Sequence, residues 1–239
     1  MYFGFAQTRD WLLGVAELAL NRASIRSGKV ELFVIPSFLS LPTAIEILAD
    51  TGARVGAQDL FWEDEGAYTG EVSGATLSEI GVALVEVGHA ERRQFFREDN
   101  EIVALKATAA LRNGLTPIIC IGEDEPIAAD EAGMHCVRQL LGALEFAPEG
   151  RVIVAYEPGW AVGAQRPASA RHISIVCAEL RLALRGLRGR NHSAVIYGGS
   201  AGPGLLNRLY GDVDGVFLGR FAHDLRALSA VLDEAERIL

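Results

Sequence analysis

The sequence contains little cysteine: Cys120, Cys136 and Cys177 are its three thiols in 239 residues. Three widely spaced cysteines fit neither a disulfide framework nor the short ligand spacing of a zinc site, and the five histidines are equally dispersed. The N-terminus lacks a basic start, and no apolar run approaches the roughly 20 residues that a membrane-spanning helix needs. We therefore expect a protein of the reducing cytoplasm, without a metal site and without a membrane partner.

Positive charge is also scarce, because 22 lysines and arginines stand against 31 aspartates and glutamates, which gives a net charge of −9. This balance opposes binding to a phosphate backbone, and no block of like charges forms a basic arm, so nucleic acid is not an expected partner. Half of the residues are hydrophobic, which is enough for one substantial core. The composition predicts a single domain over residues 1–239.

Seven short runs rich in valine, isoleucine and leucine are typical of buried parallel strands. Helix-length segments with an apolar period near 3.6 residues alternate with them. No glycine-rich dinucleotide fingerprint follows an early strand, so a closed (β/α)8 TIM barrel is favoured over an open doubly wound sheet. The expected strands lie near residues 30–36, 53–60, 83–88, 116–122, 151–158, 194–200 and 215–219, and expected helices include residues 41–49, 100–111, 169–184 and 222–239.

The sequence also lacks a first strand. The first expected helix, from about residue 8 to residue 24 with Thr8 as its N-cap, has no strand-like run before it. An eight-stranded barrel without this strand would leave unpaired backbone groups on two flanking strands. We expect a barrel whose first β-strand is missing from the chain as given, with the gap filled by residues upstream of Met1 or in some other way.

Two motifs place ionisable side chains where a strand gives way to a loop. Residues 87–93 (VGHAERR) put His89 at the start of a helical turn, where the partial positive charge of the helix end opposes a charged ring. Residues 155–160 (AYEPGW) end an apolar strand with Glu157, whose burial would raise its pKa toward that of a useful base. Both residues would lie at the carboxyl rim of a barrel, which predicts an active site. The alternatives are a structural or exposed histidine and a glutamate paired with an arginine.

Glycine-rich segments follow the later strands. Residues 158–168 (PGWAVGAQRPA) have stiff ends and a mobile tip, as expected of a lid that excludes water. Residues 197–200 (YGGS) and 217–220 (FLGR) close the last two strands, where barrels often bind phosphate through backbone N–H groups and a short helix N-terminus. The position of these two segments predicts a phosphorylated ligand.

Taken together, the motifs resemble those of triose-phosphate isomerase, and the similarity runs through nearly the whole chain. The family patterns Gly-His-Ser-Glu-Arg-Arg, Ala-Tyr-Glu-Pro-x-Trp-Ala-x-Gly and Tyr-Gly-Gly-Ser all have counterparts here. The matching segments are residues 55–58, 66–71, 88–93, 120–123, 155–163 and 197–200. The resemblance implies aldose–ketose isomerisation of a small phosphorylated sugar, without metal or cofactor, as in glycolysis and gluconeogenesis.

The resemblance also implies catalytic roles. Glu157 would carry a proton between adjacent carbons, while His89 would polarise the carbonyl group and move protons between the two oxygens, through an enediolate. Glu91 would support the catalytic residues without contacting the substrate itself. Loop 66–74 resembles the dimer loop of the family, in which Thr69 reaches the neighbouring subunit's site, and this implies a homodimer.

Binding roles follow in the same way. The resemblance implies that Gly163, Ser200, Gly219 and Arg220 hold the phosphate of the substrate. It further implies that Tyr197 and Ser200 latch the closed lid.

The chain departs from the family pattern in several places. The first strand of the family ends in Asn-x-Lys-Met-Asn, and Met1 aligns with that methionine, so the catalytic lysine would directly precede residue 1. Losing such a cation typically costs about 10²- to 10³-fold in rate. The other departures are Tyr2, Asp59 and Ala90 in place of Asn, Asn and Ser, Arg220 in place of a glycine, and an altered lid tip at residues 164–167.

Three functions are compatible with these observations. The first, and the one we expect, is a triose-phosphate isomerase that interconverts dihydroxyacetone phosphate and glyceraldehyde 3-phosphate. The second is a paralogous isomerase of a tetrulose phosphate such as erythrulose phosphate, which the altered lid tip, Ala90 and Arg220 suggest. The third is a catalytically silent barrel that binds phosphorylated ligands or a partner chain, which would follow if the lysine is truly absent.

Overall fold

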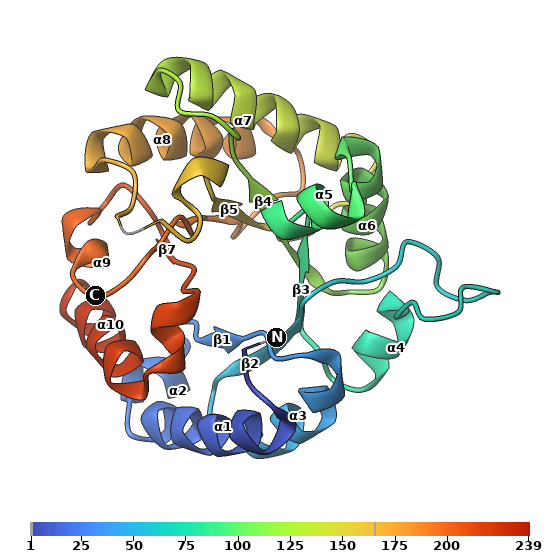
Figure 1. Cartoon of the computed structure of the whole chain (residues 1–239), viewed down its shortest axis with the longest axis vertical. Coiled ribbons are helices and arrows are strands. Elements are labelled where there is room, and N and C mark those ends of the chain that lie inside the picture. Colours follow the sequence, from blue (N-terminus) through green and yellow to red (C-terminus); the bar gives the residue numbers. More distant parts are fainter. Residues whose placement is uncertain (1, 165) are drawn as a thin grey trace.

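The computed structural model describes residues 2–164 and 166–239. In this part of the chain, seven parallel strands that are neighbours in chain order form one curled sheet, and helices cover its outer face (Figure 1). This is the architecture of a (β/α)8 barrel that lacks one strand, as the sequence predicted. The strands are β1 (Phe33–Val34), β2 (Arg54–Ala57), β3 (Leu84–Val87), β4 (Thr116–Ile121), β5 (Ile153–Tyr156), β6 (Ala194–Tyr197) and β7 (Gly215–Val216).

Each expected strand is present but shorter than its apolar run, because the ends of the runs form the loops at the two rims. The expected helices are also found, and another long helix precedes β5, in keeping with the predicted alternation of strands and helices. The α-helices are α1 (Phe5–Leu20), α2 (Ala23–Arg26), α3 (Leu41–Leu48), α4 (Gly74–Glu79), α5 (Ala90–Phe96), α6 (Asn100–Arg112), α7 (Ala129–Leu144), α8 (Ala170–Gly186), α9 (Leu205–Arg208) and α10 (Leu225–Arg237). Short 3-10 helices lie at η1 (Phe38–Ser40), η2 (Gly159–Ala161) and η3 (Arg220–His223).

The start of α1 differs from the prediction. Gly4 is the N-cap, and Thr8 lies within the first turns with its hydroxyl group donating a hydrogen bond to the Gly4 carbonyl, 2.9 Å away. Thr8 as the N-cap is therefore wrong, because its side chain bonds a carbonyl oxygen instead of the free N–H groups at the helix start. The helix also ends earlier than expected, at Leu20, before the short helix α2.

A seam separates the first and last strands of the sheet. β1 pairs only with β2, and β7 only with β6, within the described residues, and no strand precedes α1 there. The rings of Phe33 and Phe217 meet across the seam with centroids 5.9 Å apart. Outside it, α1 packs against α3 and α10, and the Trp11 indole N–H donates to the Ala222 carbonyl at 2.9 Å. The helix layer thus continues past the gap in the strand layer.

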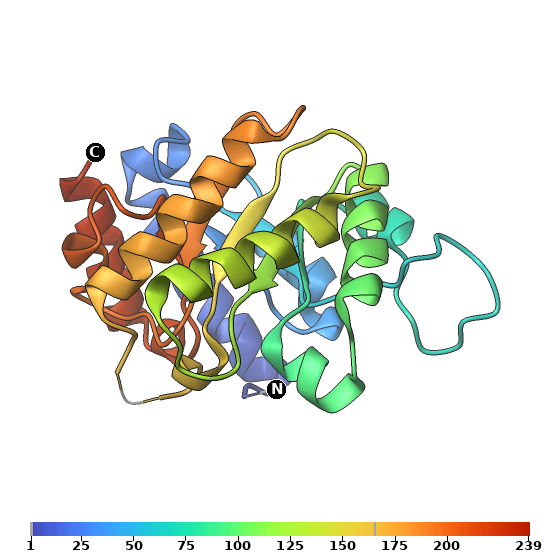
Figure 2. The same cartoon turned by 90° about the horizontal axis from the view of Figure 1, so that it is seen from above.

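The parallel order of the strands brings all their carboxyl ends to one rim. Seen from the side, α5 and the segment after β5 lie on this same side of the molecule, and so does the start of α1 (Figure 2). Side chains alternate along each strand, so that Val85 and Val87 of β3 face the helices while Leu84 faces the barrel interior. The same alternation turns Glu86 toward the barrel interior.

Candidate active site

His89 lies directly after β3, at the N-cap of α5. Gly88 turns the chain there with a φ of 73°, a left-handed conformation that favours glycine. The N–H of Glu91 donates a hydrogen bond to His89 Nδ1 at 3.3 Å. A ring that accepts at Nδ1 carries its proton on Nε2, and this nitrogen is therefore the atom that can donate to a substrate.

The ionisation of His89 differs from the expectation based on the helix end. Burial lowers the pKa of His89, but the nearby carboxyl groups of Glu86, Glu157 and Glu91 outweigh burial and raise it above the ordinary value. The helix N-terminus does contribute a hydrogen bond, yet it is one influence among several. The expectation of a lowered pKa is wrong because the helix end was considered alone, without the carboxyl groups that β3 and the segment after β5 bring to the ring.

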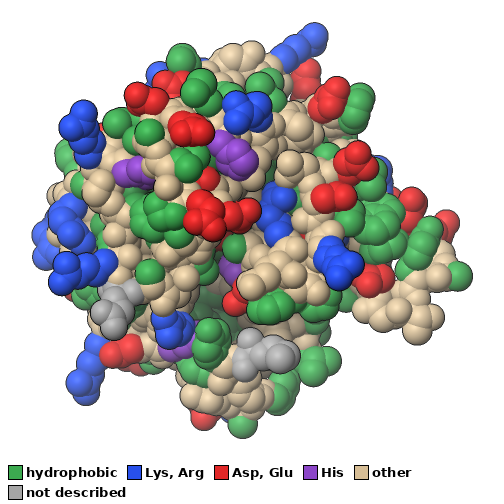
Figure 3. Space-filling model, turned by 45° about the horizontal axis from the view of Figure 1, so that its top comes forward, with side chains coloured by type: hydrophobic (Ala, Val, Ile, Leu, Met, Phe, Trp, Pro, Cys, Tyr) green, Lys and Arg blue, Asp and Glu red, His purple; other side chains and the backbone are tan. Residues whose placement is uncertain are grey.

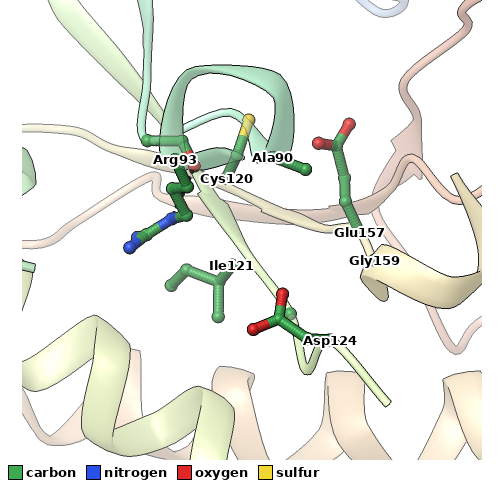
Figure 4. Close-up of a pocket in the computed structure, with 9 residues that line it drawn as sticks. Ala90, Arg93, Cys120, Ile121, Asp124, Glu157 and Gly159 are labelled. Atoms are coloured by element: carbon green, nitrogen blue, oxygen red, sulfur yellow. Dashed lines mark hydrogen bonds between the residues drawn. The ribbon is translucent and has the colours of Figure 1, made fainter. Parts of the chain in front are cut away.

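Glu157 follows β5 and is 7% exposed. Its Oε2 atom lies 3.8 Å from His89 Nε2 and has no hydrogen-bond partner among the described residues. Burial raises the pKa of Glu157, and this outweighs the opposing effect of His89. The close-up shows Arg93 directing its guanidinium group away from Glu157 (Figure 4). The alternative of a glutamate paired with an arginine is thus not what the described residues show, and Glu157 has an oxygen without a hydrogen-bond partner.

Cys120 and Ala90 flank Glu157 in a small pocket at the ends of β3, β4 and β5 (Figure 4). Ala90 offers only a methyl group, which cannot hydrogen-bond, and Glu157 Oε2 has no partner among the described residues. In the space-filling view the molecule is hollowed on this side, and acidic and basic side chains are interspersed around it (Figure 3). The rim therefore offers a recess with a free carboxyl group beside an imidazole donor.

Glu86 is a third ionisable residue of the site, and the sequence analysis did not single it out. Its Oε1 atom lies 3.8 Å from His89 Nε2, as far as Glu157 Oε2 does. The Cys120 thiol lies 3.6 Å from the same Oε1. Burial is the main reason that the pKa of Glu86 rises to about 7. A glutamate at an inward position of an apolar strand was the signal that could have revealed it.

Two glycines make room for Glu157. A Cβ atom on Gly122 would lie 2.1 Å from the Glu157 carbonyl oxygen, and one on Gly198 would lie 2.3 Å from Glu157 Oε1. The obstacle at Gly122 is the backbone of Glu157 and Pro158, whereas at Gly198 it is the side chain of Glu157. The contact at Gly198 involves the Glu157 carboxyl group itself, so it limits where that group can lie.

Replacing Gly198 by alanine is expected to lower kcat about 10- to 100-fold, because the added methyl group displaces the Glu157 carboxyl group. Gly142→Ala is the matched control, as a Cβ there meets nothing within 4 Å. Steady-state kinetics on both variants checks the prediction, and equal kcat values would show that Glu157 does not depend on this contact.

Residues of β6 and its loop hold the segment that was predicted as a lid. The Tyr197 hydroxyl accepts a hydrogen bond from the Ala168 N–H at 3.0 Å. The Ser200 hydroxyl lies within hydrogen-bond distance of two lid carbonyls, 2.8 Å from Ala161 and 3.0 Å from Ala164. The contacts expected for a latch are therefore present on both sides of the segment. Of the predicted lid tip, Gln165 lies outside the described residues.

Arg220 points its side chain at the lid. Its Nη2 atom donates to the Gly163 carbonyl at 3.1 Å, while Gly219 before it is the N-cap of η3. Both residues are exposed at the rim. A cation that also ties the lid to the loop after β7 can attract a phosphate group and close the segment over it.

The Arg220→Met variant is expected to raise KM about tenfold with a smaller change in kcat, because it removes a charge from the phosphate side and the bond to Gly163. Arg226→Met, at an exposed arginine in the first turn of α10, is the control. Steady-state kinetics separates the two parameters. A fall in kcat with unchanged KM would contradict a binding role.

A polar cluster under the lid was also missed. Glu123, which is buried, accepts hydrogen bonds from the Tyr156 hydroxyl at 3.1 Å and from the Trp160 indole at 2.9 Å. His172 Nε2 lies 2.9 Å from the same hydroxyl and 3.3 Å from Glu123. The sequence motif at residues 120–123 pointed to Glu123, but His172 stood in a helix without any local signal. The cluster fixes the first turn of the lid to the loop after β4.

Asp59 belongs to a buried ion network. Lys106 Nζ contacts Asp59 Oδ1 at 2.7 Å and Glu98 Oε1 at 2.6 Å, and Arg92 Nε contacts the same two carboxylates at 2.8 and 2.7 Å. The two cations thus balance two anions between α5, α6 and the end of β2. The network explains why an aspartate stands at position 59, where the family pattern has an asparagine. The Asp59 carboxylate binds the ammonium group of Lys106.

The remaining predicted residues are placed as follows. Glu91 is exposed, with its Oε2 atom 3.8 Å from His89 Nδ1, so its contact with the site is through His89. The loop that contains Thr69 extends away from the barrel (Figures 1 and 2) and is exposed along most of residues 66–71. Tyr2 is exposed and lies against the ring of His223, with centroids 4.9 Å apart.

Two properties of the described residues bear on the predicted absences. Within the described residues, no group of three or more histidine, cysteine, aspartate or glutamate side chains could hold a metal ion. The helices described there include none that is long and apolar enough to cross a membrane. The free thiols of Cys120, Cys136 and Cys177 are buried.

Comparison with known proteins agrees with this geometry. The chain is 47% identical over 239 residues to an L-erythrulose-1-phosphate isomerase of Pectobacterium atrosepticum, covering 98% of this chain and 92% of the relative. It is 40% identical to a protein of the same name from Rhizobium etli, with 96% and 89% covered. A triosephosphate isomerase of Mycobacteroides abscessus is 44% identical over 218 residues, with 86% and 83% covered. The sequence model of the family described as triosephosphate isomerase matches residues 1–235. The chain therefore belongs to the triosephosphate isomerase family.

Proposed function

We propose that this protein isomerises a four-carbon ketose phosphate of the type of L-erythrulose 1-phosphate by proton transfer between adjacent carbons. The observation that supports the reaction class is the unpaired Glu157 Oε2 atom, 3.8 Å from His89 Nε2. The four-carbon substrate is supported by the names of the two relatives above that are 47% and 40% identical. The triose-phosphate activity expected from the sequence becomes the alternative, supported by relatives named triosephosphate isomerase.

The proton transfer follows from the geometry of the two residues. Glu157 removes the proton from the carbon next to the carbonyl, on the side away from the phosphate, while His89 Nε2–H stabilises the carbonyl oxygen as negative charge develops on it. Glu157 then returns the proton to the former carbonyl carbon, and protons exchange between the two oxygens through His89. In L-erythrulose 1-phosphate the carbonyl thereby moves from C2 to C3, with no change in composition.

Residues at the ends of β6 and β7 would hold the phosphate. Ser200 and Gly219 border the rim there, and Gly163 lies in the lid, tied to Arg220. Tyr197 and Ser200 would keep the lid over the substrate, which excludes water from the enediolate. Glu91 would act indirectly, since its N–H orients His89.

Turnover of two substrates tests the proposal. The 239-residue chain is expected to show a kcat/KM for L-erythrulose 1-phosphate at least about tenfold higher than for dihydroxyacetone phosphate. Equal or better turnover of the triose would favour the alternative. Binding of either compound without turnover would instead indicate a catalytically silent phosphate-binding barrel.

The assembly and setting of the protein extend this proposal. We infer a homodimer in which loop 66–74 docks on a second copy, because this loop extends from the barrel with Tyr68 44% exposed. Light scattering after gel filtration is expected to give twice the chain mass, and a chain shortened in this loop should be monomeric. The three free thiols suit a reducing cytoplasm.

A further inference from the structure

Glu86 is buried in the barrel, and the proton transfer described above does not use it. The residue is 9% exposed and projects from the inner face of β3. Among the described residues its carboxyl group accepts one hydrogen bond, from the Cys120 thiol at 3.6 Å, and no lysine or arginine there forms an ion pair with it. A buried carboxyl group is costly unless its hydrogen bonds are satisfied. A carboxyl group has about four acceptor sites, so Glu86 can form further hydrogen bonds with a ligand.

The position of Glu86 is that of a residue at the reacting end of the substrate. His89 Nε2 lies 3.8 Å from Glu86 Oε1 and 3.8 Å from Glu157 Oε2, so a carbonyl group bound to this nitrogen has both carboxyl groups as neighbours. In the sheet, β3 lies three and four strands away from β6 and β7, whose loops carry Ser200 and Gly219. A substrate whose phosphate lies at those loops therefore directs its other end toward Glu86.

The chemistry of that other end separates the two candidate substrates. L-Erythrulose 1-phosphate ends there in a hydroxymethyl group beyond the reacting carbons, and a triose phosphate lacks it. A hydroxyl group both donates and accepts hydrogen bonds. Burial and the neighbouring Glu157 raise the pKa of Glu86 to about 7, while His89 opposes this, so both forms of the carboxyl group occur near neutral pH. Each form can pair with a hydroxyl group.

We propose, on the basis of the function proposed above, that Glu86 binds the terminal hydroxymethyl group of the substrate and so selects a four-carbon over a three-carbon ketose phosphate. Glu86 is then a substrate-binding residue in the barrel interior. Glu86 also raises the pKa of His89, more than Glu157 or Glu91 does, and a change at His89 would affect the turnover of both substrates.

Kinetics on two substrates tests this selection. Glu86→Val keeps a strand-forming side chain of similar volume, and it is expected to lower kcat/KM for L-erythrulose 1-phosphate about 10- to 100-fold more than it lowers the triose value. Glu86→Gln, which still hydrogen-bonds, should keep the tetrulose value within about tenfold of the wild type. Glu91→Gln is the control for charge near His89 and should leave the ratio of the two substrates unchanged. Equal losses on both substrates in Glu86→Val would overturn the proposal.

Binding of unreactive analogues separates this proposal from the proposed function. Erythritol 4-phosphate and glycerol 3-phosphate have no carbonyl group and differ by one CHOH unit. Calorimetry on the wild type is expected to show at least about tenfold tighter binding of the erythritol compound, and Glu86→Val should abolish the difference. A wild type that binds both equally, or a preference that survives in Glu86→Val, would refute the role of Glu86. If the analogues bind as expected but L-erythrulose 1-phosphate is not turned over, only the proposed reaction is refuted.

Discussion

The Glu157→Gln variant is expected to lose about 10²- to 10⁴-fold in kcat, because it removes the group placed to accept a proton. Glutamine has the shape of glutamate but cannot take up a proton at neutral pH. KM should change little, since the phosphate is assigned to Gly163, Ser200, Gly219 and Arg220 and not to the Glu157 carboxyl group. Steady-state kinetics on L-erythrulose 1-phosphate measures both values. Glu145→Gln, at an exposed carboxylate that ends α7, is the matched control.

The pH profile gives an independent measure of the same residue. Glu157 must be ionised to accept a proton, and burial raises its pKa above the ordinary value of 4.5. Activity should therefore be complete above the raised pKa and fall as the pH decreases through it, so that the acid limb of kcat/KM lies above the ordinary glutamate range. An acid limb at or below pH 4.5, or a Glu157→Gln variant with full kcat, would contradict the assignment.

The Lys106→Met variant is expected to lose about 3–5 kcal/mol of unfolding free energy, because it leaves buried carboxylates with too few cations. Lys106 is 2% exposed and contacts Asp59 and Glu98, and Arg92 alone would remain to balance both. Adding Asp59→Asn removes one negative charge and should recover part of the loss. Urea denaturation of the two variants and the wild type measures the differences.

An exposed ion pair provides the comparison. Arg188 and Glu149 lie 3.0 Å apart with side chains 94% and 61% exposed, so Arg188→Met should cost less than about 1 kcal/mol. If Lys106→Met costs no more than Arg188→Met, the buried network does not depend on its charge balance. A double variant less stable than Lys106→Met alone would also contradict the account.

Much of the fold followed from local patterns in the sequence. Alternation of short apolar runs with amphipathic segments predicted the seven strands, and the missing run before α1 predicted the gap between β1 and β7. Thr8 shows the limit of such patterns, because a threonine near a helix start can bond a carbonyl oxygen within the helix as readily as it caps the end. Helix boundaries thus depended on hydrogen bonds that residue types alone do not fix.

The residues placed around the rim show a similar division. His89 and Glu157 were predictable because each ends an apolar strand, and parallel strands end at the same rim. Glu86, Lys106 and His172 were not, because each acquires its role from partners on other strands or helices. The expected substrate also changed, from a triose phosphate to the tetrulose phosphate proposed above, since the sequence motifs are compatible with both isomerases.

The sequence by itself determined which segments become strands and which side chains stand at their carboxyl ends, because these depend on the alternation of residues along one chain. The tertiary structure decided what those side chains meet. Curling of the sheet brought Glu86 and Glu157 to equal distances from His89 Nε2, and the three carboxyl groups raised the pKa that the helix end alone would lower. Charge interactions depend on distances in space, and only the register of packed strands sets those distances.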